Sequence, residues 1–167
     1  MAGHVVRTML AADLTAVVVV TRTELVAKLD LPEDDRMIVA INDDSTSQMM
    51  DSIRLGIARL DDVFRLSRDA GVLVTPADMP KVPADAFRRC ADAFRRDPSR
   101  IVIATCAGKR GHPMVFPAAL RETLDTMSGG LNELPGRRAG EVREVAYEDA
   151  AILKDVDTPE DYEHLAR

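Results

Sequence analysis

Short runs of aliphatic and β-branched residues alternate with helical patterns along most of this chain, and that alternation restricts the folds open to it. The runs that are apolar on both faces, as in buried strands, lie at 15–21, 36–41, 71–74 and 100–105. Helical spacing of apolar residues covers 2–12, 23–29, 47–70 and 83–96. Strands that alternate with helices predict an α/β fold, in which right-handed crossovers cover both faces of a mostly parallel sheet.

The last third of the chain has a weaker pattern. It predicts a glycine-rich turn over 108–113, a short strand over 114–116, a helix over 117–127, a flexible connector over 128–138 and an edge strand over 142–145. A short strand, an acidic turn and a final helix are expected over 152–162, because Thr158, Pro159 and the acids after them form a strong helix start.

Composition favours one domain over 1–167. The 167 residues are 46% hydrophobic and 30% charged, which suits a soluble domain with an aliphatic core. The net charge of −6 and the scattered basic residues exclude a nucleic-acid stripe. Cys90 and Cys106 lack metal-ligand spacing and no signal peptide is seen, so a cytoplasmic location is expected. The longest apolar run, Ala16–Val20, is too short to span a membrane.

A single carboxylate follows the strand predicted over 71–74. The segment Thr75–Pro80 is a turn that presents Asp78 directly after a wholly apolar strand. In open α/β sheets, ligands collect beyond the carboxyl ends of the strands, where an acidic side chain is well placed to hold a hydrated cation beside a phosphate. A plain Asx turn between two prolines is the alternative interpretation.

Five motifs occur in an order and at a spacing typical of one family: Asn42, Gln48–Ile57, Thr75–Pro80, Gly108–Pro113 and Asp155–Tyr162. With these motifs, which span most of the sequence, the chain resembles the MobA-like nucleotidyltransferases, and most closely the molybdenum cofactor cytidylyltransferases. The resemblance implies a Rossmann-like three-layer α/β/α sandwich. It also implies a protein that binds a nucleoside triphosphate with magnesium, joins the nucleoside monophosphate to a phosphorylated acceptor and releases pyrophosphate.

One departure from the family pattern concerns the N-terminus. Members begin with a strand and a loop of the form Leu-Ala-Ala-Gly-x-Ser-x-Arg-Met-Gly, whose amides cradle the triphosphate, and the match here begins at Met1 on the helix after that loop. We therefore expect an N-terminally incomplete domain, from a misassigned start, a trimmed chain or a naturally shortened relative. A strand left with an open edge predicts self-association or marginal stability. Gln48 is a smaller departure, because members tend to have glycine there.

The resemblance assigns metal ligands to two segments. Asp78 is the first ligand, and the second comes from the Asp155-Val156-Asp157 turn. Asp155 and Asp157 point the same way on an extended segment, so their spacing does not identify the ligand, and we favour Asp155. For Asp157, capping of the last helix is the alternative.

The other site residues implied by the resemblance are Asn42 and Ser52 near the nucleobase and His112 near phosphate or acceptor. Asparagine offers a donor and an acceptor to a base edge, and serine offers a rotatable hydroxyl. The alternatives are a turn residue, a hydroxyl at a helix N-terminus and a structural histidine. The implied catalytic set is thus Asp78, Asp155 and His112.

The function implied by the resemblance is transfer of CMP from CTP to the phosphate of a molybdopterin-type cofactor. Two alternatives stay open. One is a non-catalytic nucleotide-binding or scaffolding protein that has lost the triphosphate loop. The other is a nucleotidyltransferase for a different phosphorylated acceptor, because a fold does not determine the substrate.

Overall fold

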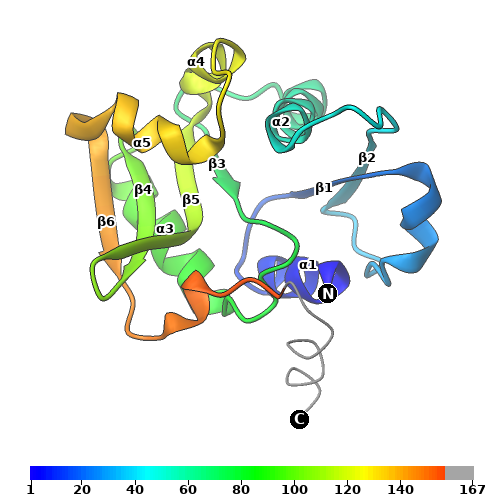
Figure 1. Ribbon diagram of the computed structural model, residues 1–167, viewed down its shortest axis with the longest axis horizontal. Coiled ribbons are helices and arrows are strands. Elements are labelled where there is room, and N and C mark those ends of the chain that lie inside the picture. The colour runs from blue at the N-terminus through cyan, green and yellow to red at the C-terminus, as the bar shows by residue number, and fades with distance from the viewer. Residues whose placement is uncertain (157–167) are drawn as a thin grey trace.

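The computed structural model describes residues 1–156, in which helices and strands alternate over most of the chain (Figure 1). The strands are β1 (Val17–Thr21), β2 (Met37–Ile41), β3 (Gly71–Val74), β4 (Ile101–Cys106), β5 (Lys109–Pro117) and β6 (Val142–Ala146). The α-helices are α1 (Ala2–Leu10), α2 (Met49–Phe64), α3 (Ala84–Arg96), α4 (Arg121–Asp125) and α5 (Leu134–Arg137). Short 3-10 helices include η1 (Thr23–Lys28), η3 (Leu131–Glu133) and η5 (Ala150–Leu153). Within residues 1–156, every helix is too short or too polar to cross a membrane.

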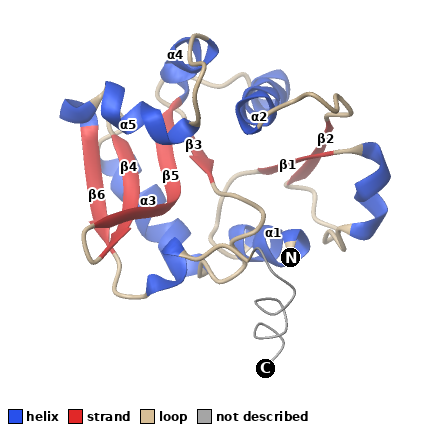
Figure 2. Ribbon diagram, in the orientation of Figure 1, coloured by secondary structure: helices blue, strands red, loops and turns tan. Residues whose placement is uncertain are grey.

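The strands form two separate sheets, which Figure 2 shows on either side of the molecule. One sheet contains β1 and β2, and the other has the order β3-β5-β4-β6. The pairs β1–β2 and β4–β6 are parallel, as the alternation of strands and helices predicts. Strand β5 runs antiparallel to both of its neighbours, β3 and β4. The second sheet is therefore mixed.

The antiparallel direction of β5 comes from a tight turn. Cys106 pairs with Lys109, so Ala107 and Gly108 alone connect β4 to β5, with φ angles of 49° and 76°. Positive φ at both central residues is the type I′ geometry that suits the twist of a β-hairpin. The turn predicted over 108–113 is thus wrong beyond Gly108, because residues 109–113 belong to β5.

Two apolar clusters cover opposite faces of the larger sheet. Alternate residues of β4 divide between them, with Val102 and Ala104 in one cluster and Ile101 and Ile103 in the other. Helix α3 contributes to the first cluster, while residues of α2, α4 and α5 lie in the second. The three-layer α/β/α arrangement is therefore confirmed, with helices on both faces of the sheet.

Helix α3 follows its sequence pattern closely. Phe87, Cys90 and Phe94 recur at helical spacing and are buried against the sheet. Burial raises the pKa of the Cys90 thiol to about 12, which keeps it protonated at neutral pH.

Other boundaries differ from the predictions. Helix α2 ends at Phe64 and not at residue 70, because Arg65 has a left-handed φ of 50° and the Asp61 carboxylate accepts a hydrogen bond from the Leu66 N–H. The connector predicted over 128–138 contains η3 and α5, since Leu131 and Leu134 are buried. Residues 152–153 lie in the 3-10 helix η5 and not in a strand, and Asp149 caps this helix through the Ala151 N–H.

Candidate functional site

Three buried polar atoms lie where β3 ends beside β5. They are Thr75 Oγ1, Asp78 Oδ1 and His112 Nδ1, and none of them has a hydrogen-bond partner within the part of the chain that the structure describes. Buried polar side-chain atoms in folded proteins nearly always have a partner. Three such atoms in one region make it the candidate site, since a ligand, an ion or water could supply the missing contacts.

The pairing of β3 with β5 brings these residues together. Val74 lies opposite Met114 in an antiparallel register, so Thr75, just after β3, meets the part of β5 that precedes Met114. His112 and Pro113, which are joined by a cis peptide bond, occupy that part of β5. A carbon added at Gly111 would overlap the carbonyl oxygen of Ile152, so β5 also packs tightly on η5.

The segment after η5 returns to the loop that carries Asp78. The Val156 N–H donates a hydrogen bond to the Asp78 carbonyl oxygen at 2.8 Å. Asp155, next to Val156, is exposed to solvent. The main chains of the two predicted metal-binding segments are therefore in contact, whereas Asp157 lies outside the described residues.

His112 is held in a neutral form by its surroundings. Burial has the largest effect and lowers the pKa of His112, while a hydrogen bond to the Val74 backbone and the negative charge of Asp78 act in the opposite direction. Nδ1 of this imidazole has no hydrogen-bond partner within residues 1–156. In a neutral imidazole one ring nitrogen is a donor and the other is an acceptor.

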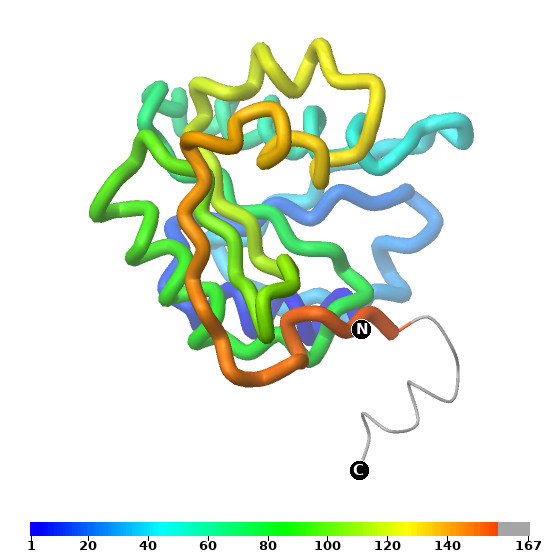
Figure 3. Tube along the Cα trace, turned by 60° about the vertical axis from the view of Figure 1, so that its left-hand side comes forward, coloured from blue at the N-terminus to red at the C-terminus, as the bar shows by residue number. Residues whose placement is uncertain are grey.

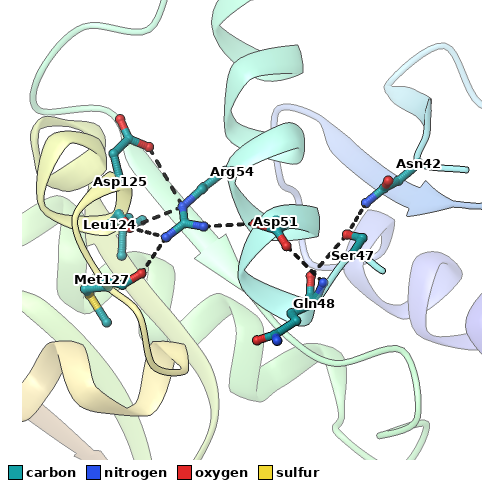
Figure 4. Close-up of polar contacts among 8 residues, drawn as sticks. All are labelled: Asn42, Ser47, Gln48, Asp51, Arg54, Leu124, Asp125 and Met127. Atoms are coloured by element: carbon teal, nitrogen blue, oxygen red, sulfur yellow. Dashed lines mark hydrogen bonds and ion pairs between the residues drawn. The ribbon is translucent and has the colours of Figure 1, made fainter. Parts of the chain in front are cut away.

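Asn42 and Ser52 belong to a second group, at the start of α2 (Figure 4 shows the contact of Asn42 with Ser47). Asn42 Nδ2 donates to Ser47 Oγ at 2.7 Å, and the Asp44 N–H approaches Asn42 Oδ1 at 3.4 Å. Ser52 is half-buried in the first turn of α2, and its backbone N–H donates to the Gln48 carbonyl oxygen. The amide donor of Asn42 is thus engaged inside the loop between β2 and α2.

Arg54 fixes this second group to a distant part of the chain, and the sequence analysis missed it. Its guanidinium donates to the carbonyl oxygens of Leu124, at 2.8 and 3.2 Å, and of Met127, at 2.6 Å. It also pairs with Asp51, whose carboxylate accepts from the Gln48 N–H (Figure 4). No local spacing signals a contact across about seventy residues. Thr75 was also missed, although it stands in the same motif as Asp78.

The sequence pattern of the family described as MobA-like NTP transferase domain matches residues 1–144. The chain belongs to this family. The resemblance expected from the motifs Thr75–Pro80 and Gly108–Pro113 is thereby confirmed, because both motifs lie within the matched residues.

Solved structures similar to this MobA-like domain share its fold. Rv0371c from Mycobacterium tuberculosis H37Rv has 23% sequence identity and a TM-score of 0.75, with 98% of this chain and 81% of that chain covered. For 4-diphosphocytidyl-2C-methyl-D-erythritol synthase the identity is 18%, the TM-score 0.76 and the coverage 98% and 87%. CMP:2-keto-3-deoxy-manno-octonic acid synthetase complexed with CTP has 13% sequence identity and a TM-score of 0.69, with 97% of this chain and 84% of that chain covered. Another structure of Rv0371c is a complex with manganese. A search of curated proteins finds no match.

The carboxylates near the candidate site of this MobA-like domain are too few to hold a hard cation by themselves, so a bound ligand would have to supply further oxygen atoms. Within residues 1–156, no three His, Cys, Asp or Glu side chains form a metal-binding group. Asp78 has one orphaned carboxylate oxygen, and Asp155 adds an exposed carboxylate from the adjoining segment. Magnesium and similar ions are usually held by one or two carboxylates and complete their shell with phosphate oxygens and water. The residues present fit a cation that arrives with a triphosphate.

Proposed function

We propose that this chain binds a nucleoside triphosphate, with CTP preferred, at the region formed by Thr75, Asp78 and His112. The transferred group is CMP, the acceptor is the phosphate of a molybdopterin-type cofactor, and pyrophosphate is released. The observation that carries the proposal is the set of orphaned polar atoms at the end of β3 in a member of the MobA-like NTP transferase family. The CTP-bound structure of a protein with this fold supports the choice of nucleotide.

A divalent cation, proposed to be magnesium, would be held by Asp78 and by Asp155 or Asp157. The manganese complex of a structurally similar protein supports a divalent ion in this fold. When bound, such an ion neutralises charge on the phosphates and stabilises pyrophosphate as the leaving group. Asp78 is suited to its role because the Val156 N–H holds its main chain in place.

Thr75 and His112 would orient the reacting phosphates. The Thr75 hydroxyl can donate to a phosphate oxygen, and its position after β3 places it beside the strand end that carries Asp78. His112 Nδ1 can accept a hydrogen bond from a protonated phosphate or a hydroxyl of the acceptor. His112 would therefore position the acceptor. Because its pKa is lowered, its imidazole stays neutral at neutral pH and does not take a proton from the acceptor.

Recognition of the base is proposed for Asn42 and Ser52. Asn42 Nδ2 donates to Ser47, and Oδ1 accepts only one long hydrogen bond, from the Asp44 N–H at 3.4 Å, so Oδ1 keeps a lone pair for a ligand. A carbonyl oxygen accepts from the exocyclic amine of cytosine, which agrees with CTP as the substrate. Ser52 adds a hydroxyl from the first turn of α2.

Calorimetry of magnesium and CTP binding tests the site. We expect weak binding that depends on magnesium, and we expect Asp78→Asn to abolish the magnesium-dependent part, since it removes a ligand charge. Asp62→Asn is the matched control, because Asp62 is exposed on α2 and its side chain makes no hydrogen bond or ion pair within residues 1–156. Equal binding by Asp78→Asn and the wild-type chain would refute the site.

A non-catalytic nucleotide-binding role is the second candidate. It concerns a polypeptide of these 167 residues alone, in which no segment has the form Leu-Ala-Ala-Gly-x-Ser-x-Arg-Met-Gly. Donors of that kind are each worth about a hundredfold or more in rate. Pyrophosphate release from CTP and molybdopterin separates the two roles: we expect very slow turnover by residues 1–167, and rapid turnover would exclude the non-catalytic role.

A further inference from the structure

Strand β6 forms an open edge of the larger sheet. Within residues 1–156 it pairs with β4 alone, at the end of the order β3-β5-β4-β6. Figure 1 draws it at the outer end of the sheet, and Figure 3 shows the same strand from that outer side. The strand that precedes Thr75 and Asp78, β3, lies at the opposite end of this sheet. A partner bound at β6 would therefore be separate from the proposed nucleotide site.

The hydrogen bonds to β4 determine which backbone groups of β6 face outward. The Tyr147 N–H donates to the Thr105 carbonyl oxygen at 2.7 Å, and Thr105 lies opposite Ala146. In a parallel ladder of this register, Val145 and Tyr147 bond to β4, while the residues that alternate with them do not. The N–H groups of Glu144 and Ala146 therefore point to the open side of the strand.

A groove with a basic lining lies beside this edge, between α3 and β6. It has a volume of about 300 Å³, and its charged lining residues are Arg89, Asp92, Arg96, Arg143 and Glu144. Arg89 and Arg96 are seven residues apart, so they lie on the same face of α3. We call this feature the α3–β6 groove.

Both carboxylates of the α3–β6 groove already have partners. Asp92 pairs with Arg95 at 2.7 Å, on the same helix. Glu144 pairs with Arg110 of β5 at 3.0 Å. The negative charges in the groove are therefore balanced by arginines that do not line it.

Two arginines of the α3–β6 groove keep their charge unpaired. Within residues 1–156 the side chains of Arg96 and Arg143 make no hydrogen bond or ion pair, and both are exposed. Arg89 is already engaged, because it donates to the Ala146 carbonyl oxygen at 3.0 Å and lies 5.1 Å from the centre of the Tyr147 ring. The groove is thus locally positive, although the chain has a net charge of −6.

We propose that β6 binds an extended acidic segment of a partner protein, which adds a fifth strand to the sheet β3-β5-β4-β6. The main chain of the segment would bond to the outward groups of Glu144 and Ala146, and its side chains would alternate between the two faces of the sheet. Val145 packs against the cluster that contains residues of α3, so Arg143, two positions away, faces the same side. Acidic side chains at alternate positions would therefore meet Arg96 and Arg143.

A second copy of β6 suits this edge less well than an acidic partner does. In an antiparallel pair of identical strands around a two-fold axis, the central residue lies opposite its own copy. With the axis near the middle of β6, either Arg143 would face Arg143 or Glu144 would face Glu144. Like charges directly opposite each other are destabilising, so the edge favours a partner of different sequence.

Amide hydrogen exchange of the full chain with the peptide Glu-Val-Glu-Val-Glu, acetylated and amidated at its ends, tests the proposal. At ten times the dissociation constant of the peptide, exchange at the Glu144 and Ala146 amides should slow about tenfold. Amides of β3, at the other end of the sheet, should not change. The peptide Lys-Val-Lys-Val-Lys is the control, and equal protection of β6 by this peptide would overturn the proposal.

The double variant Arg96→Gln, Arg143→Gln tests the charge of the groove. Each change removes one exposed ion pair, which is worth about two- to fivefold in affinity, so the double variant should bind the acidic peptide about tenfold more weakly. Arg59→Gln is the control, because Arg59 is exposed on α2 and its side chain makes no hydrogen bond or ion pair within residues 1–156. Equal affinity of the double variant and the wild-type chain would overturn the proposal.

Glu144→Pro tests the backbone contact. Proline removes an outward N–H that β4 does not use, and proline is tolerated on edge strands. This variant should lose the protection of the Ala146 amide, whereas Glu144→Gln, which removes the same charge, should keep it. Unchanged binding by Glu144→Pro, or no binding at about 1 mM peptide, would overturn the proposal. Protection of β6 that rises with protein concentration without peptide would also do so, because a second copy would then be the occupant.

Discussion

The His112 imidazole shows how position within the fold changes the chemistry of one residue. Its ring lies near the charge of Asp78, which alone would favour the protonated form. Burial has the larger effect and lowers the pKa of His112 below the usual value of 6.5. At the residue scale, the candidate site therefore offers a carboxylate and a neutral acceptor side by side.

The shift in His112 predicts how stability depends on pH. The folded state binds a proton at His112 less readily than the unfolded state does. The neutral, buried imidazole therefore contributes fully to the free energy of unfolding above pH 6.5, and this contribution is lost as the pH falls below 6.5. Urea unfolding between pH 7.5 and 5.5 should show a smaller decrease in stability for His112→Gln than for the wild-type chain. Identical pH profiles would contradict the neutral, buried imidazole.

At the scale of elements, long-range contacts hold the site segments in place. Arg54 connects the first turns of α2 to Leu124 in α4 and to Met127 just after it, and Gly111 permits β5 to pack directly on η5. Each contact joins elements that are far apart in sequence. Changes at these positions should therefore affect stability and the geometry of the site together.

Arg54→Met tests the first contact. Methionine keeps an unbranched stem but leaves the carbonyl oxygens of Leu124 and Met127 without the guanidinium, which should cost about 1–3 kcal/mol of unfolding free energy. Arg59→Met is the control, because Arg59 is exposed on α2 and its side chain has no hydrogen bond or ion pair within residues 1–156. Equal denaturation midpoints for the two variants would show that Arg54 does not stabilise α2.

Gly111→Ala tests the packing of β5 on η5. The added methyl group would overlap the Ile152 carbonyl oxygen, so we expect a loss of roughly 1–3 kcal/mol in thermal or urea unfolding. Gly140→Ala provides the comparison, since nothing lies within 4 Å of a carbon added there. A neutral effect at both positions would mean that η5 moves away from β5 at little cost.

At the scale of the whole molecule, the separation of the two sheets is the dominant feature. Only helices and loops connect β1 and β2 to the sheet β3-β5-β4-β6 within residues 1–156. A continuous sheet would bury more of the apolar surface of β1 and β3. We therefore expect the open edges to govern both the stability and the association of the isolated chain.

Sedimentation and thermal unfolding check this expectation. The chain of residues 1–167 should self-associate as its concentration rises, or unfold with a midpoint below about 45 °C, the lower end for mesophilic domains. A monomer at every concentration with a midpoint near 60 °C would show that α1 and α2 alone suffice to join the sheets.

Local patterns were sufficient for most elements and for the fold class. Apolar runs such as 100–105 predict β4, and the spacing of Phe87, Cys90 and Phe94 predicts α3, because burial of one face imposes a period on the sequence. The turn after β3 likewise indicated Asp78, since Thr75–Pro80 places a carboxylate at a strand end. These inferences depend only on neighbours within a few residues.

Tertiary structure decided the remaining features. The orphaned atoms of Thr75, Asp78 and His112 come together only when β5 pairs with β3, and the segment of Asp155 reaches them through the bond from Val156 to Asp78. The division into two sheets depends on which strands find partners, which no local pattern specifies. Pairing, burial and pKa arise from contacts between distant residues, and these contacts exist only in the folded chain.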